Sequence, residues 1–338
     1  MTSPTQAAMT AGVLMEQLSD PTVSASLAVG VVSLLIVFIL TMKPAKKFLP
    51  VNDFQPLALV RKEILSHDTV RFTFGLPSPD HELGLPIGQH LSLKFTNAEG
   101  KPVQRSYTPT SLEHTKGEVS LVIKVYRPSP PKFPNGGQMS QHLDSLKIGD
   151  TILVKGPKGH MEWKGEGSYQ NKPLGKPLQS RYCKQITMIA GGTGITPMLQ
   201  ILHSIFANPS TVMRVKLIYA NQSENDILVR EELEALAKEY PTQFSLWYTV
   251  DKAVTPSWQY DTGFINKDMI EKHGLFSSGP TEFFMCGPVR LLSPEFRSSS
   301  IVSHTHSLSS CSQPPMIKFA CLPALTELGY SDKEWVIF

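Results

Sequence analysis

The stretch 186–202, ITMIAGGTGITPMLQIL, restricts the possible folds more than any other part of the chain. It starts with an apolar run typical of a parallel strand that is covered on both faces. Three glycines follow, which let the backbone turn sharply and approach a ligand: Gly191, Gly192 and Gly194. Thr196 can cap the next helix, and Pro197 suits its first turn. Because free N–H groups at a helix start attract anions, this pattern predicts a site for a phosphate-bearing cofactor.

Taken alone, the glycine stretch also fits a strand, turn and helix that only pack tightly, because its spacing is neither GxGxxG nor a Walker loop. Three more motifs surround it in the chain: Arg105–Ser111 (RSYTPTS), Gly136–Ser140 (GGQMS) and Cys286–Pro288 (CGP). In this order the four motifs resemble the flavin reductase family of the ferredoxin–NADP reductase type, and within it the reductases that serve cytochrome b5. The resemblance runs from about Phe54 to the C-terminus.

Two different patterns divide the chain after residue 53. Short β-forming runs between turn residues predict a small antiparallel barrel. Its expected strands are 57–65, 69–74, 90–95, 119–126 and 151–155, with a helix at 139–146. From Ile186 strands alternate with helices, which predicts a doubly wound parallel sheet. Its later elements are expected at 215–220, 224–240 (a helix), 244–250 and 282–286.

The expected domains are therefore of two fold classes, all-β and α/β. With the resemblance, they become an FAD-binding antiparallel β-barrel at 54–164, a polar interdomain linker at 165–182 and an NADH-binding doubly wound domain at 183–338. The resemblance implies hydride transfer from NADH to FAD, single-electron transfer to cytochrome b5, and a monomer.

The N-terminal part predicts a membrane anchor. Residues 21–42 carry no charge, and about 20 apolar residues span a bilayer. No basic residue precedes the segment and three lysines follow closely, which favours an uncleaved transmembrane helix over a cleaved signal peptide and places the rest of the chain in the cytosol. Residues 1–20 are expected to be disordered and residues 43–53 to form a linker. The endoplasmic reticulum and the mitochondrial outer membrane both remain open.

Composition excludes several functions. The net charge of +3 and the absence of a basic block with aromatic residues argue against nucleic-acid binding. The four cysteines have no CxxC spacing and no histidines at metal-ligand distances, so we expect reduced thiols and no metal site.

The resemblance implies roles on the flavin side. Arg105 would pair with the pyrophosphate, while Tyr107 and Pro109 would line the isoalloxazine. Thr108 would hydrogen-bond near N5, with His90 behind it as a proton relay, although a lone histidine is more often structural. The expected FAD contacts are Arg105, Ser106, Tyr107, Thr108, Pro109, Thr110, Ile123, Lys124, Val125, Tyr126, Gly136, Gly137, Gln138, Met139 and Ser140.

On the nicotinamide side, Cys286 would lie beside the ring carbon C4, as a positioning group rather than a nucleophile. A buried structural cysteine is the alternative. Asp251 follows a strand, where an acid favours a ribose hydroxyl and repels a 2′-phosphate, so we expect NADH rather than NADPH. The expected dinucleotide contacts are Gly191, Gly192, Thr193, Gly194, Thr196, Pro197, Asp251, Cys286, Gly287 and Pro288. Thr108, His90 and Cys286 form the expected catalytic set.

One segment, 289–313, interrupts this pattern. It contains nine serines, and its deletion leaves CGPPPMIKFACLPALTELGY, the uninterrupted pattern of the family. Valine codons begin with GT and one glutamine codon is CAG, so Val289 and Gln313 can mark the ends of an in-frame intron. We hypothesise an unspliced intron. A real serine-rich surface loop is the alternative, because loops tolerate insertions.

Three functions remain open at this point. The first is an anchored NADH-dependent reductase of cytochrome b5, which a basic face with Lys124, Lys132 and Lys158 would attract. The second is a flavin reductase with another electron acceptor, such as that of a nitrate reductase or a desaturase system. The third is a flavin-binding protein that segment 289–313 inactivates.

Overall fold

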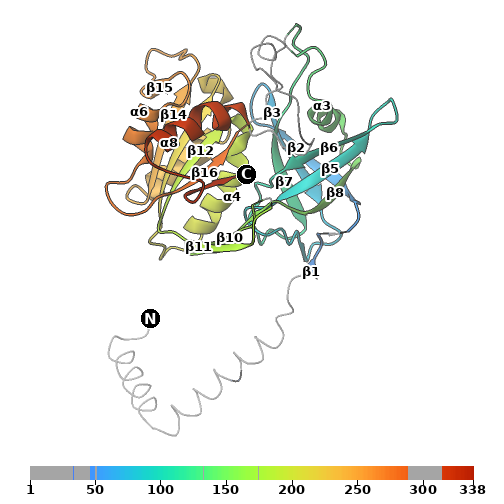
Figure 1. The fold of residues 1–338 in the computed structure, drawn as a ribbon. Coiled ribbons are helices and arrows are strands. Elements are labelled where there is room, and N and C mark those ends of the chain that lie inside the picture. The colour runs from blue at the N-terminus through green and yellow to red at the C-terminus, as the bar shows by residue number, and fades with distance from the viewer. Residues whose placement is uncertain (1–32, 34–45, 50–51, 132, 174, 288–313) are drawn as a thin grey trace, which may run out of the picture. The chain divides into compact units, whose positions relative to one another are not determined.

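The computed structural model describes residues 33, 46–49, 52–131, 133–173, 175–287 and 314–338. The predicted disordered N-terminus 1–20, the predicted anchor 21–42 except Ser33, and segment 289–313 lie outside the described residues. Within the described part of the chain, no helix is both long enough and apolar enough to cross a bilayer. Residues 47–338 form one compact unit, which holds both predicted domains (Figure 1).

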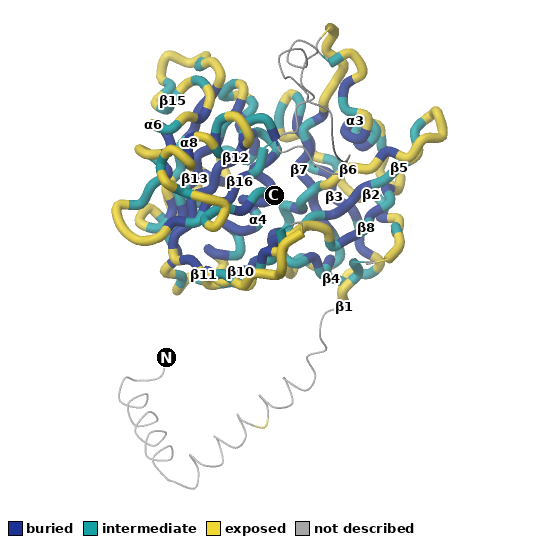
Figure 2. Tube along the Cα trace, in the orientation of Figure 1, coloured by how far each residue is buried: buried dark blue, intermediate teal, exposed yellow. Residues whose placement is uncertain are grey.

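The first domain is an antiparallel sheet of six strands in the order β6-β5-β8-β2-β3-β7. The strands are β2 (Gln55–Ile64), β3 (Thr69–Gly75), β5 (His90–Thr96), β6 (Pro102–Tyr107), β7 (Glu118–Lys124) and β8 (Thr151–Lys158), and the helix is α3 (Gln138–Ser145). Two further two-residue strands, β1 (Lys46–Lys47) and β4 (His81–Glu82), form a separate pair. The sheet curves around one apolar core, in which Phe72, Leu91 and Leu143 are fully buried (Figure 2). The predicted all-β domain is confirmed.

The second domain is a parallel sheet in the order β15-β14-β13-β12-β16-β17. The strands are β12 (Gln185–Gly191), β13 (Arg214–Asn221), β14 (Phe244–Val250), β15 (Asp261–Thr262), β16 (Glu282–Cys286) and β17 (Trp335–Ile337). The helical segments are η1 (Gly192–Gly194), α4 (Ile195–Phe206), η2 (Glu224–Asp226), α5 (Arg230–Glu239), α6 (Lys267–Met269), η3 (Ile270–Gly274), η4 (Ile317–Cys321) and α8 (Leu322–Glu327).

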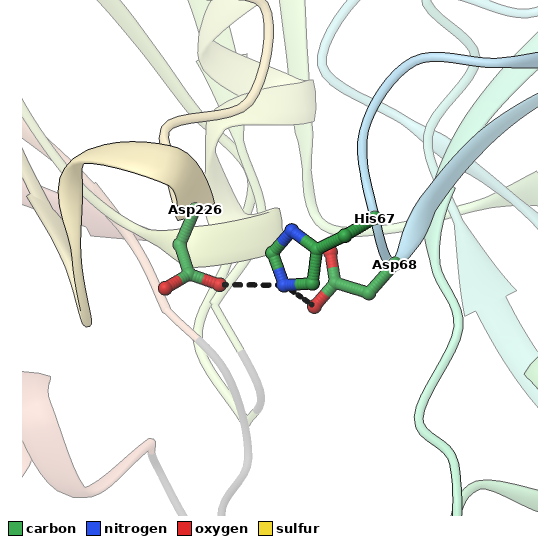
Figure 3. Close-up of side chains that lie close together, drawn as sticks. All are labelled: His67, Asp68 and Asp226. Carbon is green, nitrogen blue, oxygen red and sulfur yellow. Dashed lines mark ion pairs between the residues drawn. The ribbon is translucent and has the colours of Figure 1, made fainter.

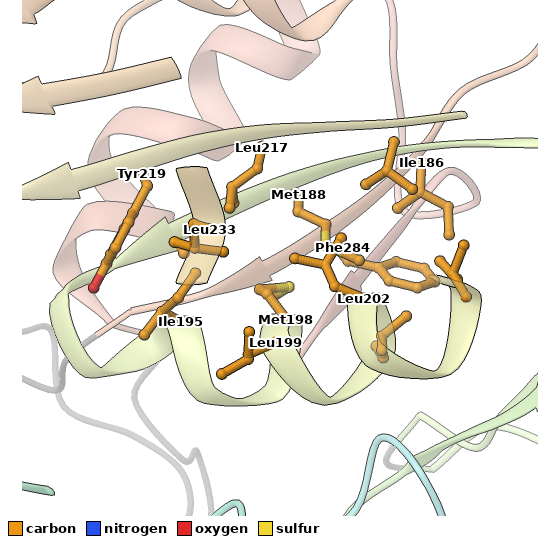
Figure 4. Packing of buried hydrophobic residues seen from close by; sticks show 14 of the residues in the cluster. Ile186, Met188, Ile195, Met198, Leu199, Leu202, Leu217, Tyr219, Leu233 and Phe284 are labelled. Carbon is orange, nitrogen blue, oxygen red and sulfur yellow. The ribbon is translucent and has the colours of Figure 1, made fainter. Parts of the chain in front are cut away.

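Helices cover both faces of this sheet because its strands are apolar on both sides. On one face Met198 and Leu202 of α4 lie against Met188 and Phe284 (Figure 4). On the other face, a second cluster joins Ile189 and its neighbours to α6, η3, η4 and α8. Strand order reverses at β12, since β13 and β14 lie on one side of it and β16 on the other. Ligands of such sheets bind at the carboxyl ends of the strands on either side of this reversal.

Segment 165–182, predicted to be a polar interdomain linker, has regular structure. This segment contains β10 (Ser168–Asn171) and β11 (Gln179–Tyr182), which form an antiparallel sheet with β9 (Met161–Gly165). The cause is Tyr169, which is almost fully buried among the side chains of the α/β core. Its hydroxyl donates to Glu282, which also accepts a hydrogen bond from Arg181. The polar composition of the segment therefore gave no indication that it contains a deeply buried tyrosine.

The predicted helix at 224–240 starts later than expected. Residues Glu224–Asp226 form the short 3-10 turn η2, and α5 begins only at Arg230. Val229 adopts a left-handed conformation with φ +51°, which separates the two segments because a helix cannot continue through it. The edge strands β6, β15 and β17 were not predicted from the sequence.

Substitution of two glycines in the β9–β10 turn tests whether the turn packs closely against Cys183. Both have positive φ, but a Cβ on Gly167 would lie 2.0 Å from the carbonyl oxygen of Cys183, whereas a Cβ on Gly165 would meet nothing within 4 Å. We expect Gly165→Ala to lower the free energy of unfolding by about 1–2 kcal/mol, the left-handed penalty alone. Gly167→Ala should cost about 3 kcal/mol or more. Urea denaturation of both variants measures this, and equal losses would contradict the close packing.

Candidate functional site

The glycine loop at the end of β12 is shaped by its contact with β16. Ala190 pairs with Cys286 in the parallel sheet. A Cβ on Gly194 would lie 2.3 Å from the carbonyl oxygen of Cys286, so only glycine allows this approach. Gly192, in contrast, has φ +49° and would place a Cβ in open space. The loop therefore packs on β16 at one glycine and leaves its backbone accessible at another.

The start of α4 follows directly on η1, whose carbonyls at Gly192 and Thr193 accept from the N–H of Ile195. Its N-cap is Gly194, and no side chain caps the helix. The predicted capping role of Thr196 is wrong, because Thr196 lies inside the first turn and its hydroxyl donates to the carbonyl of Thr193 (3.2 Å). Because the N–H of Ile195 is already bonded and Pro197 has no N–H, the glycine turn before α4, with Gly192 in open space, is the part of this region that fits the phosphates of a dinucleotide.

Cys286 ends β16 beside this loop. Burial raises the pKa of its thiol to about 12, partly offset by a hydrogen bond with the backbone of Gly287. The thiol therefore stays protonated at neutral pH, and a thiol is a poor nucleophile compared with a thiolate. This fits the predicted positioning role. Pro288, the last predicted contact, lies outside the described residues.

Asn221 is a candidate site residue that the sequence analysis missed. It ends β13, next to β12, and its carbonyl accepts a hydrogen bond from the N–H of Asp251 (3.1 Å). Its side chain is buried, and neither polar atom of the amide has a hydrogen-bond partner within the described residues. An unpaired buried amide is costly, so this position suits a ligand that both donates and accepts. Its place at the carboxyl end of a parallel strand was the available signal.

The Arg105–Ser111 motif lies on β6 and the loop that follows it. β6 pairs with β5 in a register that places Leu91 opposite Tyr107, so His90 and Thr108 each adjoin one of these two paired residues in the chain. The guanidinium of Arg105 is exposed and donates to the carbonyl of Gln104 (2.7 Å), with no carboxylate partner among the described residues. Arg105 remains a proposed partner of the FAD pyrophosphate.

Two titratable groups at this motif, His90 and Tyr107, are uncharged at neutral pH. Burial lowers the pKa of His90, and the nearby His160 and Lys158 lower it further. Burial also raises the pKa of Tyr107 well above its usual range. His90 is therefore a neutral imidazole that can accept a proton, and Tyr107 is a neutral phenol.

The glycine pair before α3 is locked to the end of β7. Gly136 has φ +61°, and a Cβ there would lie 2.5 Å from the carbonyl oxygen of Tyr126. The N–H of Gly137 donates to that carbonyl (2.8 Å), while the hydroxyl of Ser140 accepts from the N–H of Tyr126 (3.1 Å). No side chain caps α3, so its N–H groups remain free for an anion. The arrangement fits the FAD pyrophosphate, with Ser140 fixing the loop.

Lys124 does not lie on an open basic face. Its ammonium nitrogen is 2.8 Å from Asp68 and 2.5 Å from Asp226, and the side chain is 15% exposed. The predicted contribution of Lys124 to a surface for cytochrome b5 is therefore wrong. Of its predicted companions, Lys158 is exposed and Lys132 lies outside the described residues.

The two domains contact each other near the Arg105–Ser111 motif and near α4, the helix that follows the glycine loop. The N–H of Gly88 in the barrel domain donates to the side-chain oxygen of Gln200 on α4 (2.7 Å). Gln200 also lines one small cavity with Pro109 from the flavin motif.

A larger depression of about 460 Å³ lies at the amino ends of β13 and β14, lined by Arg214, Lys216 and Phe276. That depression is at the edge of the sheet opposite the glycine loop, so it is not part of this site.

Comparison with known families agrees with the division of the chain into two domains. Residues 56–163 match the oxidoreductase FAD-binding domain family, and residues 188–293 match the oxidoreductase NAD-binding domain family. Together with the barrel and the doubly wound sheet, these matches define a two-domain flavin- and nicotinamide-dependent oxidoreductase.

Proteins that are similar over most of their length identify the family within this class of oxidoreductase. NADH-cytochrome b5 reductase 2 of Gallus gallus is 48% identical over 81% of this chain and 82% of its own length. NADH-cytochrome b5 reductase 1 of Homo sapiens is 40% identical over 93% of this chain and 97% of its own length. The crystal structure of the cytochrome b5 reductase domain of Ulva prolifera nitrate reductase superposes with a TM-score of 0.73 at 40% identity, covering 86% of this chain and all of that one. The chain belongs to the NADH–cytochrome b5 reductase family.

The open space at Gly192 leads to a prediction. We expect Gly192→Ala to fold, because its Cβ meets no protein atom, but to weaken NAD⁺ binding about tenfold by intruding on the dinucleotide. Gly329→Ala is the matched control, since Gly329 also has positive φ and open surroundings. Calorimetric titration of both FAD-loaded variants with NAD⁺ measures the effect. Unchanged affinity in Gly192→Ala would place the dinucleotide elsewhere.

Proposed function

We propose that this chain is a membrane-anchored NADH–cytochrome b5 reductase, which takes a hydride from NADH onto FAD and passes single electrons to cytochrome b5. The observation that carries the proposal is the presence, in one compact unit, of two uncapped helix starts behind glycine turns. One lies in the FAD-binding domain and one in the NAD-binding domain, and the domains meet beside both motifs. The acceptor is taken from the relatives that share most of the chain.

Some residues of the site would bind the cofactor phosphates, and others would position the reacting rings. Arg105 and the N–H groups at Gly137 and Gln138 would hold the FAD pyrophosphate. The backbone at Gly192 and the start of α4 would hold that of NADH. When bound, FAD supplies the conversion between a two-electron hydride donor and a one-electron acceptor.

Thr108 and His90 are the proposed proton pathway. The pairing of Leu91 with Tyr107 supports it, because His90 and Thr108 each adjoin one of these two paired residues in the chain. The lowered pKa of His90 keeps its imidazole neutral near pH 7, so it can accept a proton that leaves the flavin N5 by way of Thr108. Cys286, with its protonated thiol, would fix the nicotinamide without reacting with it.

The membrane anchor is proposed from the sequence. Segment 21–42 is uncharged and of bilayer-spanning length, and the lysines that follow it favour a cytosolic location for the rest of the chain. The endoplasmic reticulum and the mitochondrial outer membrane fit equally. A monomer is the proposed state.

The described residues that flank segment 289–313 support its absence from the mature protein. A Cβ on Gly287 would lie 3.7 Å from the Cβ of Pro314, so the two Cα atoms lie within about 7 Å of each other. Two Cα–Cα steps span at most about 7.6 Å, and Pro288 alone can therefore join Gly287 to Pro314. Beyond the segment, Ile317 and Leu325 are fully buried in the core. Excision of 289–313 would leave the sheet and its covering helices in place.

Flavin bleaching tests the function with and without this segment. We expect the FAD-loaded chain lacking 289–313 to bleach on anaerobic addition of NADH and then to reduce cytochrome b5, because both cofactor cradles are complete in it. The full chain should bleach more slowly, since the insertion follows directly on the nicotinamide motif. A shortened chain that binds FAD but does not bleach would contradict the function. Sequencing of the transcript is the control, and a message that retains these codons would refute the intron.

Asp251 tests the coenzyme preference. Its carboxylate would bind the ribose hydroxyls of NADH and repel the 2′-phosphate of NADPH. We expect Asp251→Ala to lower the ratio of kcat/KM for NADH to that for NADPH by about tenfold or more. Asp53→Ala, which removes an exposed carboxylate just before the barrel domain, is the control. An unchanged ratio in Asp251→Ala would assign selectivity to another residue.

A further inference from the structure

Lys124 connects the two domains through a pair of carboxylates. It ends β7 in the barrel domain, and its ammonium nitrogen lies 2.8 Å from Oδ2 of Asp68, in the turn between β2 and β3. The same nitrogen lies 2.5 Å from Oδ1 of Asp226, which belongs to η2 in the α/β domain. His67 lies beside both carboxylates, with Nε2 3.4 Å from Asp68 and 3.9 Å from Asp226 (Figure 3).

These contacts are the charged link between the domains. Among the described residues, every ion pair that joins the barrel domain to the α/β domain ends on Asp226. The side chains of Lys124, Asp68 and Asp226 are 15%, 17% and 13% exposed, so solvent and salt screen them less than a surface pair. Removing one partner of such a pair leaves the other charge poorly compensated.

Neighbouring groups hold the carboxylates in place. The second oxygen of Asp226 accepts a hydrogen bond from the hydroxyl of Ser223 (2.6 Å). The hydroxyl of Thr69 donates to Asp68 (3.0 Å). Burial alone would raise the pKa of Asp226, but the hydrogen bonds from Lys124 and Ser223 outweigh it and hold the pKa below its usual range. The Lys124–Asp226 pair is therefore fully charged at neutral pH.

A metal ion is not needed to explain this cluster. His67, Asp68 and Asp226 place one ligand-type atom each within 4.8 Å of the others. The ammonium of Lys124 already lies between the two carboxylates and supplies the positive charge that a cation would bring. The cluster is accordingly a link between side chains.

The position of the pair ties it to both cofactor cradles. Lys124 is followed by Val125 and Tyr126, and the carbonyl of Tyr126 holds the start of α3 through Gly137. Asp226 follows Asn221, the last residue of β13, by a short turn. A displacement across this pair would therefore move the flavin cradle relative to the dinucleotide crevice. A shift of about 1 Å between reacting groups can reduce a rate by about 100-fold.

We propose that Asp226 is a positioning residue for hydride transfer: through Lys124 it fixes the α/β domain against the flavin cradle, so that the nicotinamide ring approaches the flavin at the productive distance. This inference rests on the proposed function. It assigns Asp226 no contact with either cofactor. Loss of the pair should therefore slow the hydride step more than it weakens binding.

The test uses the FAD-loaded full chain and stopped-flow measurement of flavin bleaching over a range of NADH concentrations. We expect Asp226→Asn to lower the limiting bleaching rate about tenfold, with less than threefold change in the NADH concentration at half-maximal rate. Asp226→Glu keeps the charge and should recover most of the rate. Asp332→Asn is the matched control, because Asp332 forms an exposed ion pair with Lys176 at a similar distance (2.7 Å). Hydrogen exchange at 66–70 and 222–228 should rise in Asp226→Asn alone.

The possible outcomes separate the two claims. Failure of NADH to bleach the FAD-loaded chain both with and without 289–313 contradicts the proposed function itself. Bleaching of Asp226→Asn at the wild-type rate, or a loss expressed only in the NADH concentration required, overturns the positioning role. If Asp226→Asn fails to retain FAD, Ser223→Ala is the milder variant, since it releases only one oxygen of the carboxylate. A wild-type limiting rate and unchanged hydrogen exchange in Ser223→Ala then overturn the role.

Discussion

The close approach of the glycine loop to β16 is the contact on which the site depends. The backbone at Gly194 lies against the carbonyl of Cys286, leaving no room for a side chain at this position. This approach joins the end of β12 to the end of β16 at the reversal of strand order, where open α/β sheets bind their ligands. It also directs the uncapped start of α4 toward the same edge. One missing Cβ thus brings together the loop, the helix start and Cys286.

Much of the fold could be predicted because its signals are local. The strands β3, β5, β12, β13 and β14 carry apolar runs of the right length, and the structure confirms them within one or two residues. The failures had long-range causes. The segment 165–182 is polar in composition, yet Tyr169 inserts its ring between Trp163 and Phe284 and thereby orders two strands. Contacts with residues more than a hundred positions away, such as Glu282, leave no mark in a local pattern.

The candidate site, like the fold, contains some residues that local sequence indicates and others that only distant contacts explain. Motifs proposed to bind through their own backbone, such as Gly136–Gly137 and Gly191–Gly194, could be located because positive φ and close approach require glycine. Lys124 could be noticed but not interpreted, since its partners Asp68 and Asp226 come from distant parts of the chain. Asn221 was missed for another reason. An asparagine after a strand is ordinary until burial shows that its amide has no partner among the described residues.

The distribution of charge follows from the chemistry that the site has to support. A hydride carries its electron pair between two aromatic rings, and a full charge beside them would favour one redox state over the other. The groups assigned to that region are uncharged near pH 7, because burial lowers the pKa of His90 and raises those of Tyr107 and Cys286. Arg105 is the proposed partner of a pyrophosphate, while Lys124 and Asp226 neutralise each other at the domain boundary, where their attraction fixes geometry without adding net charge to the site.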